Sequence, residues 1–115
     1  GSIGVYMALA DFTKAYEAMG IKVDVIKNKE GTFKAAGLPG TAMTPDQRSH
    51  FESKVQASFS EFSRAVKSAR PEATAESMQG QTFNGREAKA AGLVDRVGDK
   101  SFALGVLRQM IRAKG

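Results

Sequence analysis

The sequence predicts an α/β fold in a single domain of 115 residues. Residues 3–9, IGVYMAL, are apolar throughout, which is typical of a strand buried on both faces of a parallel sheet. Residues 21–25 alternate apolar with charged side chains, as in a strand with one face in solvent. A short helical segment separates the two, so together they form a βαβ unit, for which a right-handed crossover is expected.

The segment between these strands, residues 11–19, has helical spacing, with Phe12, Tyr16 and Met19 on one side and Gly20 as the C-cap. After the second strand, residues 28–43 show little periodicity. They contain the loop-forming residues Gly31, Gly37, Pro39 and Gly40. A loop of this length inside a compact domain is either functional or disordered, so it is a candidate site.

A long helix is predicted to follow. Thr44 can cap it, Pro45 suits the first helical position, and Gln47 completes a capping box. Apolar residues then recur at steps of three and four, namely Phe51, Val55, Phe59, Phe62 and Val66. This stripe indicates an amphipathic helix that packs on a core and ends near Arg70-Pro71.

The remaining residues predict a small set of short elements. We expect a brief helix over 73–78 and a short strand at 82–83. Asn84 and Glu87 form a second capping pair for a helix that ends at Gly92 in the left-handed conformation. A strand over 93–97 and a last helix complete the domain, and the helix is defined by Ala103, Leu107, Met110 and Ile111.

Composition excludes several classes of function. With no cysteine and a single histidine, His50, thiolate and histidine metal sites are not expected, nor is a disulfide. No apolar run approaches the ~20 residues that span a bilayer. The net charge is +5, but the basic residues are dispersed among acidic ones and no aromatic cluster accompanies them, so we expect no specific nucleic-acid binding.

The order of these elements, with TFNGREAKAAGLVDRVG after the long helix, resembles the signal peptide peptidase A family, including its viral branch, the capsid assembly or prohead proteases. These are serine peptidases with a Ser–Lys dyad. The resemblance covers nearly the whole chain but only the C-terminal part of the family's catalytic domain. It implies that residues 1–115 are the C-terminal portion of a Ser–Lys peptidase domain, with the superhelical βαβ units of Clp protease and crotonase. The nucleophilic serine would lie upstream.

Lys34 is the general base that this resemblance implies, because the family places this lysine three residues after a glycine, just past the second strand. In EGTFK, Lys34 follows Gly31 and has no carboxylate within three residues. A solvated lysine amine, with a pKa of about 10.4, is protonated at neutral pH, and burial is the usual way to make it a base. The loop lacks the K-x-x-G-N-P or K-D motif common in the family, so Lys27 and Lys29 remain alternatives.

Ser2 is the second residue that the resemblance implies. In the bacterial enzymes the serine of the G-S-x-G-V strand hydrogen-bonds the lysine amine and orients it, and Ser2 holds that position in GSIGV. The alternative is that Gly1-Ser2 is a remnant of cloning. For His50, an exposed position on the long helix is the simpler interpretation.

The resemblance implies acyl transfer from a protein substrate to serine and then to water, without cofactor or metal. The substrates would be membrane-resident signal peptides or capsid scaffold and portal proteins, and the protein would be bacterial and membrane-associated or in a phage prohead. A homo-oligomer is expected, with membrane association only through regions outside this sequence. This chain alone should be inactive. The alternative function is a non-catalytic oligomerisation or scaffold module of the same fold.

Overall fold

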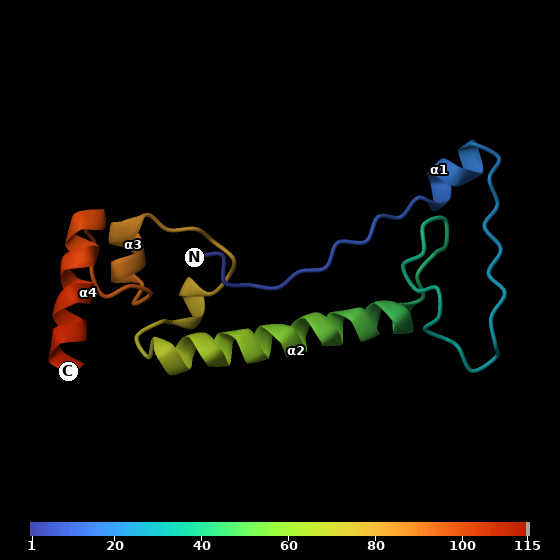
Figure 1. The fold of residues 1–115 in the computed structure, drawn as a ribbon. Helices are drawn as coiled ribbons and strands as arrows, with labels where there is room; N and C mark the ends of the chain where they lie inside the picture. Colours follow the sequence, from blue (N-terminus) through green and yellow to red (C-terminus); the bar gives the residue numbers. More distant parts are fainter. Residues whose placement is uncertain (115) are drawn as a thin grey trace. The chain divides into compact units, whose positions relative to one another are not determined.

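The computed structural model describes residues 1–114, and every regular element in this range is helical (Figure 1). In chain order these are α1 (Thr13–Ala18), α2 (Pro45–Ala69), a 3-10 helix (Ala75–Ser77), α3 (Gly85–Ala90) and α4 (Lys100–Lys114). The predicted helices are therefore present, each within a few residues of its expected bounds.

The predicted α/β fold is wrong for this structure, because residues 1–114 contain no strand. The segments 3–9, 21–25, 82–83 and 93–97 run without a sheet. Residues 2–3 and 80–81 share two backbone hydrogen bonds, from Ser2 N–H to the Gln81 carbonyl at 2.7 Å and from Gly80 N–H to the Ile3 carbonyl at 2.9 Å, and this pairing does not extend to residues 4–11. An apolar pattern states which side chains avoid water, but a strand also needs a neighbouring backbone with which to exchange hydrogen bonds. Residues 4–11 have no such neighbour among the described residues.

The chain divides into two compact units. Unit 1 comprises Gly1–Gly4 and Phe62–Gly115, and unit 2 comprises Val5–Glu61. Each unit has its own internal contacts, and the assignment of residues 1–115 to one peptidase domain stays a prediction.

Unit 1 holds the apolar core of the described residues. Four apolar residues are buried there: Ile3, Ala73, Met78 and Ala88. The N-terminus is fixed in this unit because the Ser2 N–H donates to the Gln81 carbonyl at 2.7 Å. The short helix α3 begins as predicted, with a reciprocal capping box between Asn84 and Glu87.

Unit 2 contains α1, the 28–43 loop and the beginning of α2. Gln47 is its one buried residue within the described range, at 7% exposure. Its backbone N–H donates to the Thr44 hydroxyl at 3.2 Å, and the Thr44 N–H donates to the Gln47 side chain at 3.1 Å. The predicted capping box at the start of α2 is confirmed, and the same glutamine also fixes the loop, as described below.

The apolar stripe of α2 is only half-buried. Phe51, Val55, Phe59 and Val66 are of intermediate exposure, and Phe62 is 40% exposed. The helix ends at Ala69, close to the predicted end before Pro71. The periodicity thus predicted the helix and its bounds correctly, whereas the expected burial of the stripe in a core is not observed.

Candidate active site

Lys34 lies in a series of tight turns in unit 2. The Gly31 N–H donates to the Asn28 carbonyl at 3.1 Å, and the Lys34 N–H donates to the Gly31 carbonyl at 3.0 Å. The Lys34 side chain is exposed. Within residues 1–114 its amine forms neither an ion pair nor a hydrogen bond. The turns therefore fix the backbone of Lys34 and leave its amine free for a partner.

Gly31 is required by the close approach of its neighbours. A Cβ atom at this position would lie 2.6 Å from the Asn28 side-chain oxygen and 3.1 Å from Lys34 Cγ. Both distances are shorter than ordinary carbon contacts, so any side chain at position 31 displaces Asn28 or the stem of Lys34. Local steric crowding thus explains why a glycine stands three residues before the lysine.

The loop is anchored to the first turn of α2. Gln47 Nε2 donates to the Thr32 carbonyl at 2.7 Å, two residues before Lys34. The Phe33 ring packs on the His50 ring with centroids 4.9 Å apart. His50 is exposed, as predicted, but its contact with Phe33 and the role of Gln47 were not foreseen. The capping box was the only sequence signal at Gln47, and its third hydrogen bond depends on the tertiary fold.

The two alternative lysines have different surroundings. Lys27 Nζ donates to the Thr32 carbonyl at 3.4 Å, so its amine is directed back to the loop backbone. Lys29 is exposed in the turn at residues 29–30. The Thr32 carbonyl that accepts from Lys27 also accepts from Gln47 of α2, whereas Lys29 has no such contact in the described residues. Of the three lysines, Lys34 is the nearest in sequence to residues 32 and 33, which contact α2.

The nearest upstream carboxylate, Glu30, is held by groups other than Lys34. Its own backbone N–H, and then the Asn28 side-chain amide, lower the pKa of Glu30 below its ordinary value. The Asn28 Nδ2 to Glu30 Oε2 distance is 3.1 Å. Glu30 is therefore a stable anion at neutral pH, and its hydrogen-bonding capacity is used within the turn.

Ser2 lies in unit 1, whereas Lys34 lies in unit 2. Ser2 is exposed and has a positive φ of 57°, an unusual conformation for a residue with a side chain. Its N–H donates to the Gln81 carbonyl, and its hydroxyl has no partner within the described chain. The backbone of Ser2 is fixed and the side chain is accessible.

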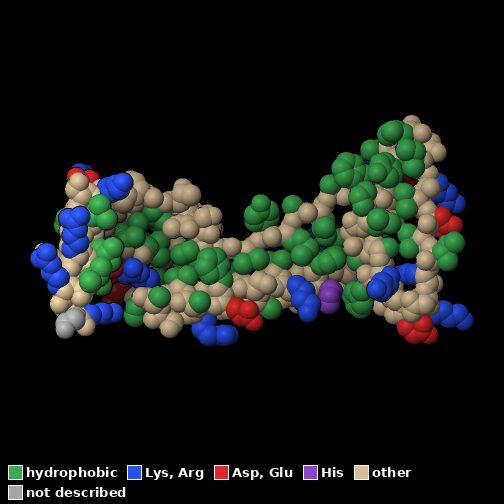
Figure 2. All heavy atoms as spheres, viewed as in Figure 1, with side chains coloured by type: hydrophobic (Ala, Val, Ile, Leu, Met, Phe, Trp, Pro, Cys, Tyr) green, Lys and Arg blue, Asp and Glu red, His purple; other side chains and the backbone are tan. Residues whose placement is uncertain are grey.

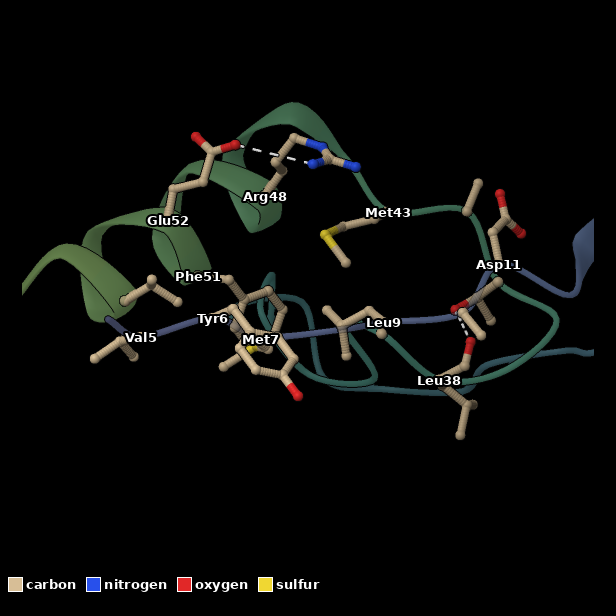
Figure 3. A pocket seen from close by; sticks show the side chains of 15 residues that line it. Val5, Tyr6, Met7, Leu9, Asp11, Leu38, Met43, Arg48, Phe51 and Glu52 are labelled. Carbon is tan, nitrogen blue, oxygen red and sulfur yellow. Dashed lines mark hydrogen bonds and ion pairs between the residues drawn. The ribbon is translucent and has the colours of Figure 1, made fainter. Parts of the chain in front are cut away.

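A pocket of about 540 Å³, lined about equally by polar and apolar surface, lies in unit 2 (Figure 3). The extended segment 5–11, the loop 37–43 and the first turns of α2 line it. Leu9 packs against Gly37, where a Cβ would lie 3.2 Å from the leucine side chain. On one edge Arg48 and Glu52 form an ion pair at 3.9 Å. The pocket can accept an apolar side chain, with charged groups at its margin.

Two classes of feature are absent from the described part of the chain. Residues 1–114 contain no group of three histidine, cysteine or acidic side chains that could hold a metal ion. None of their helices is long and apolar enough to cross a membrane.

Comparison with known proteins identifies the class. The chain matches the model of peptidase family S49 over residues 1–114, and it belongs to this family. The resemblance to signal peptide peptidase A and to phage capsid proteases is thereby confirmed.

Three curated relatives represent different branches. A suspected protease of Methanocaldococcus jannaschii is 32% identical over 113 residues, covering 96% of this chain and 36% of that protein. Capsid assembly protease C of Escherichia phage lambda is 29% identical over 120 residues, covering 99% of this chain and 26% of that protein. The chloroplastic serine protease SPPA of Arabidopsis thaliana is 29% identical over 112 residues, covering 95% of this chain and 16% of that protein. The chain thus spans at most about a third of the length of these relatives.

Proposed function

We propose that this chain is the lysine-bearing part of a serine endopeptidase that uses a Ser–Lys dyad, with Lys34 as the general base. The observation that carries the proposal is the anchored turn around Lys34. Gly31 makes room for the lysine stem, Gln47 holds the Thr32 carbonyl, and the lysine amine has no partner in the described residues. Membership of peptidase family S49 supports peptide hydrolysis as the reaction.

In this mechanism the neutral Lys34 amine takes the proton from the nucleophilic serine hydroxyl as its oxygen attacks the peptide carbonyl. The resulting ammonium returns that proton to the leaving amine when the C–N bond breaks. Water then attacks the acyl-enzyme and gives a proton to the Lys34 amine. The Lys34 ammonium passes this proton to the serine oxygen as the ester C–O bond breaks, which releases the acid product and restores the serine. No cofactor or metal takes part in these steps.

The nucleophile belongs, in this proposal, to a segment of the parent protein that precedes residue 1. The relatives are about three to six times longer than the part this chain matches, which leaves room for such a segment. Ser2 orients the lysine by accepting a hydrogen bond from its amine on the accessible hydroxyl oxygen, which leaves the lone pair of the amine for the nucleophile. By itself the chain is expected to hydrolyse no peptide, because a base without a nucleophile forms no acyl-enzyme.

The test is made in the full-length parent protein with a quenched fluorescent peptide or a protein substrate. Lys34→Ala and Lys34→Arg should each reduce kcat by about 100-fold or more, since a guanidinium stays protonated and cannot act as a base. Lys27→Ala and Lys29→Ala are the matched controls and should retain activity. Activity that survives Lys34→Ala but is lost with either control would assign the base to another lysine.

Ser2 requires a separate measurement. If its hydroxyl orients Lys34, Ser2→Ala should lower kcat and shift the acidic limb of the kcat–pH profile, where Lys34 loses its proton, because the lysine loses a hydrogen-bond partner. Ser2→Thr keeps a hydroxyl and should retain part of the activity. An unchanged pH profile in Ser2→Ala would show that this residue has only a structural role.

The proposed substrates are proteins or peptides. The pocket of unit 2, with Met7, Leu9, Leu38 and Phe51 among its lining residues, supports an apolar side chain as one element of the substrate. The phage and chloroplast relatives are equally similar to this chain, at 29% identity, so the chain is assigned to neither branch.

The alternative is a non-catalytic oligomerisation or scaffold module. The half-exposed apolar stripe of α2 favours it, because an amphipathic helix with an uncovered apolar side is a typical protein contact. A parent protein that assembles normally and hydrolyses no peptide, with or without Lys34→Ala, would establish this alternative.

A further inference from the structure

The net positive charge of the chain comes entirely from one unit. Unit 2 carries seven basic and seven acidic residues, so its net charge is zero. Unit 1 carries ten basic and five acidic residues, and its net charge of +5 is that of the whole chain. Most of this excess lies in α4, which contains four basic residues and no acidic one: Lys100, Arg108, Arg112 and Lys114. A charge asymmetry of this kind indicates an anionic partner.

The basic residues of α4 are not neutralised within the described residues. The two ion pairs found there, Arg48–Glu52 and Arg70–Asp95, involve no residue of this helix. The nearest acidic residue, Asp99, accepts a hydrogen bond from the Phe102 N–H at 2.8 Å and so caps the helix. The positive charge is therefore available to a partner from outside.

The same helix carries an exposed apolar face. No described residue of α4 is buried. The α4 apolar face consists of Leu104, Leu107, Met110 and Ile111, which are 43%, 52%, 58% and 63% exposed. Their spacing places them along one side, with Arg108 and Arg112, four residues apart, along one edge of it. Lys100 and Lys114 lie on the same side, at the two ends of the helix. Figure 2 shows hydrophobic and basic side chains gathered together over α4.

We propose that α4 is an amphipathic helix that binds the surface of membranes containing anionic lipids. Basic residues attract the lipid phosphates, and an apolar face of leucine, isoleucine and methionine enters the boundary between headgroups and acyl chains. A nucleic acid would use the charge and leave the apolar face in water.

The dimensions of α4 fit this placement. At about 1.5 Å per residue its 15 residues extend ~22 Å, which is shorter than a bilayer core, so the helix lies in the plane of the membrane. The long side chains of Arg108 and Arg112 can bury their stems and keep the guanidinium groups among the phosphates. The binding is independent of the peptidase proposal, because none of these residues belongs to the candidate active site.

The test uses the 115-residue chain and vesicles of phosphatidylcholine, alone or mixed with phosphatidylglycerol, in a flotation assay. Binding is expected only to the anionic vesicles and should weaken with salt. Arg108→Gln with Arg112→Gln should lower the partition coefficient about 30-fold, which corresponds to about 1 kcal/mol for each basic residue. The matched control, Lys14→Gln with Lys22→Gln, removes the same charge from unit 2 and should bind as the unsubstituted chain does.

The apolar face is tested by insertion. The chain has no tryptophan, so Leu107→Trp provides a single fluorophore whose emission should shift to the blue on anionic vesicles. Ile26→Trp is the control, because Ile26 is 95% exposed in unit 2, and its emission should not shift. Equal binding to both kinds of vesicle, or no binding, overturns the proposal. So does tighter binding to duplex DNA that depends on Arg108 and Arg112 but not on Leu107→Gln with Ile111→Gln.

Discussion

At the residue scale, Gly31 controls the position of the proposed base. A methyl group there would meet the Asn28 side-chain oxygen at 2.6 Å and Lys34 Cγ at 3.1 Å. Asn28 can rotate away, so Gly31→Ala should change stability little but move the lysine stem. We expect kcat of the parent enzyme to fall by as much as about 100-fold, the usual effect of misplacing a catalytic group by about 1 Å.

Gly37→Ala provides the contrasting control for this prediction. Gly37 has a φ of +77°, so a side chain there is strained, and unfolding should become easier by about 1 kcal/mol. The measurements are kcat and the denaturant midpoint of both variants. A Gly31→Ala enzyme with normal kcat would remove the steric argument for Lys34.

The ion pair between Arg70 and Asp95 predicts an acid sensitivity in unit 1. Arg70 Nη1 lies 2.6 Å from Asp95 Oδ1, and the hydrogen bond from Arg70, followed by its charge, lowers the pKa of Asp95 below the ordinary value. A lowered folded-state pKa stabilises the fold above the unfolded pKa of about 3.9, and this stabilisation is lost as the pH falls through the folded-state pKa.

Asp95→Asn tests this sensitivity. The variant should lose stability at neutral pH, and its unfolding midpoint should depend less on pH below about 4 than that of the unsubstituted chain. Because both side chains are partly exposed, high salt should reduce the difference. Parallel pH dependences for the two proteins would show that the pair contributes nothing measurable.

The proposed site could be predicted from the sequence only in part. The resemblance singled out Lys34, which no local pattern distinguishes from Lys27 or Lys29. The contacts that hold its loop, from Gln47 to Thr32 and from His50 to Phe33, join residues about 15 positions apart, and local sequence rules carry no information on such pairs.

At the element scale, local chemistry predicted the helices and failed for the strands. Helix ends are fixed by nearby residues, and both predicted capping boxes, Thr44–Gln47 and Asn84–Glu87, are present. A strand depends on a partner that can lie anywhere in the sequence. The apolar run of residues 3–9 and the alternation of residues 21–25 were therefore insufficient evidence for a sheet.

The capping box of α3 should be its principal local support. The helix has only six residues, and Ala88 alone is buried. Asn84→Ala removes the side-chain oxygen that accepts from the Glu87 N–H at 3.0 Å and should cost about 1 kcal/mol. Because so short a helix is marginal, amide exchange should increase over Gly85–Ala90. Asn84→Asp keeps the acceptor and should preserve protection from exchange. Equal exchange in the unsubstituted chain and both variants would show that tertiary packing, and not the capping box, stabilises α3.

At the scale of the whole molecule, apolar surface exceeds the core. Only four apolar residues of the described chain are buried, and large exposed ones include Tyr6, Met7 and Leu9 in a segment without backbone hydrogen bonds. Unpaired backbone groups beside apolar side chains favour pairing with another chain. The 115-residue chain should therefore self-associate, and its weight-average sedimentation coefficient should rise with concentration.

Tyr6→Pro locates this association. Proline removes a backbone donor and is tolerated poorly in a paired strand, while the Tyr6 side chain, 88% exposed, contributes little packing that could be lost. The variant should associate less than the unsubstituted chain, and Ile26→Pro, at an even more exposed position, should associate as before. If both variants behave alike, the segment 4–11 is not the contact, and the exposed stripe of α2 becomes the next surface to test. A chain that remains monomeric over a wide concentration range would contradict the expectation of self-association.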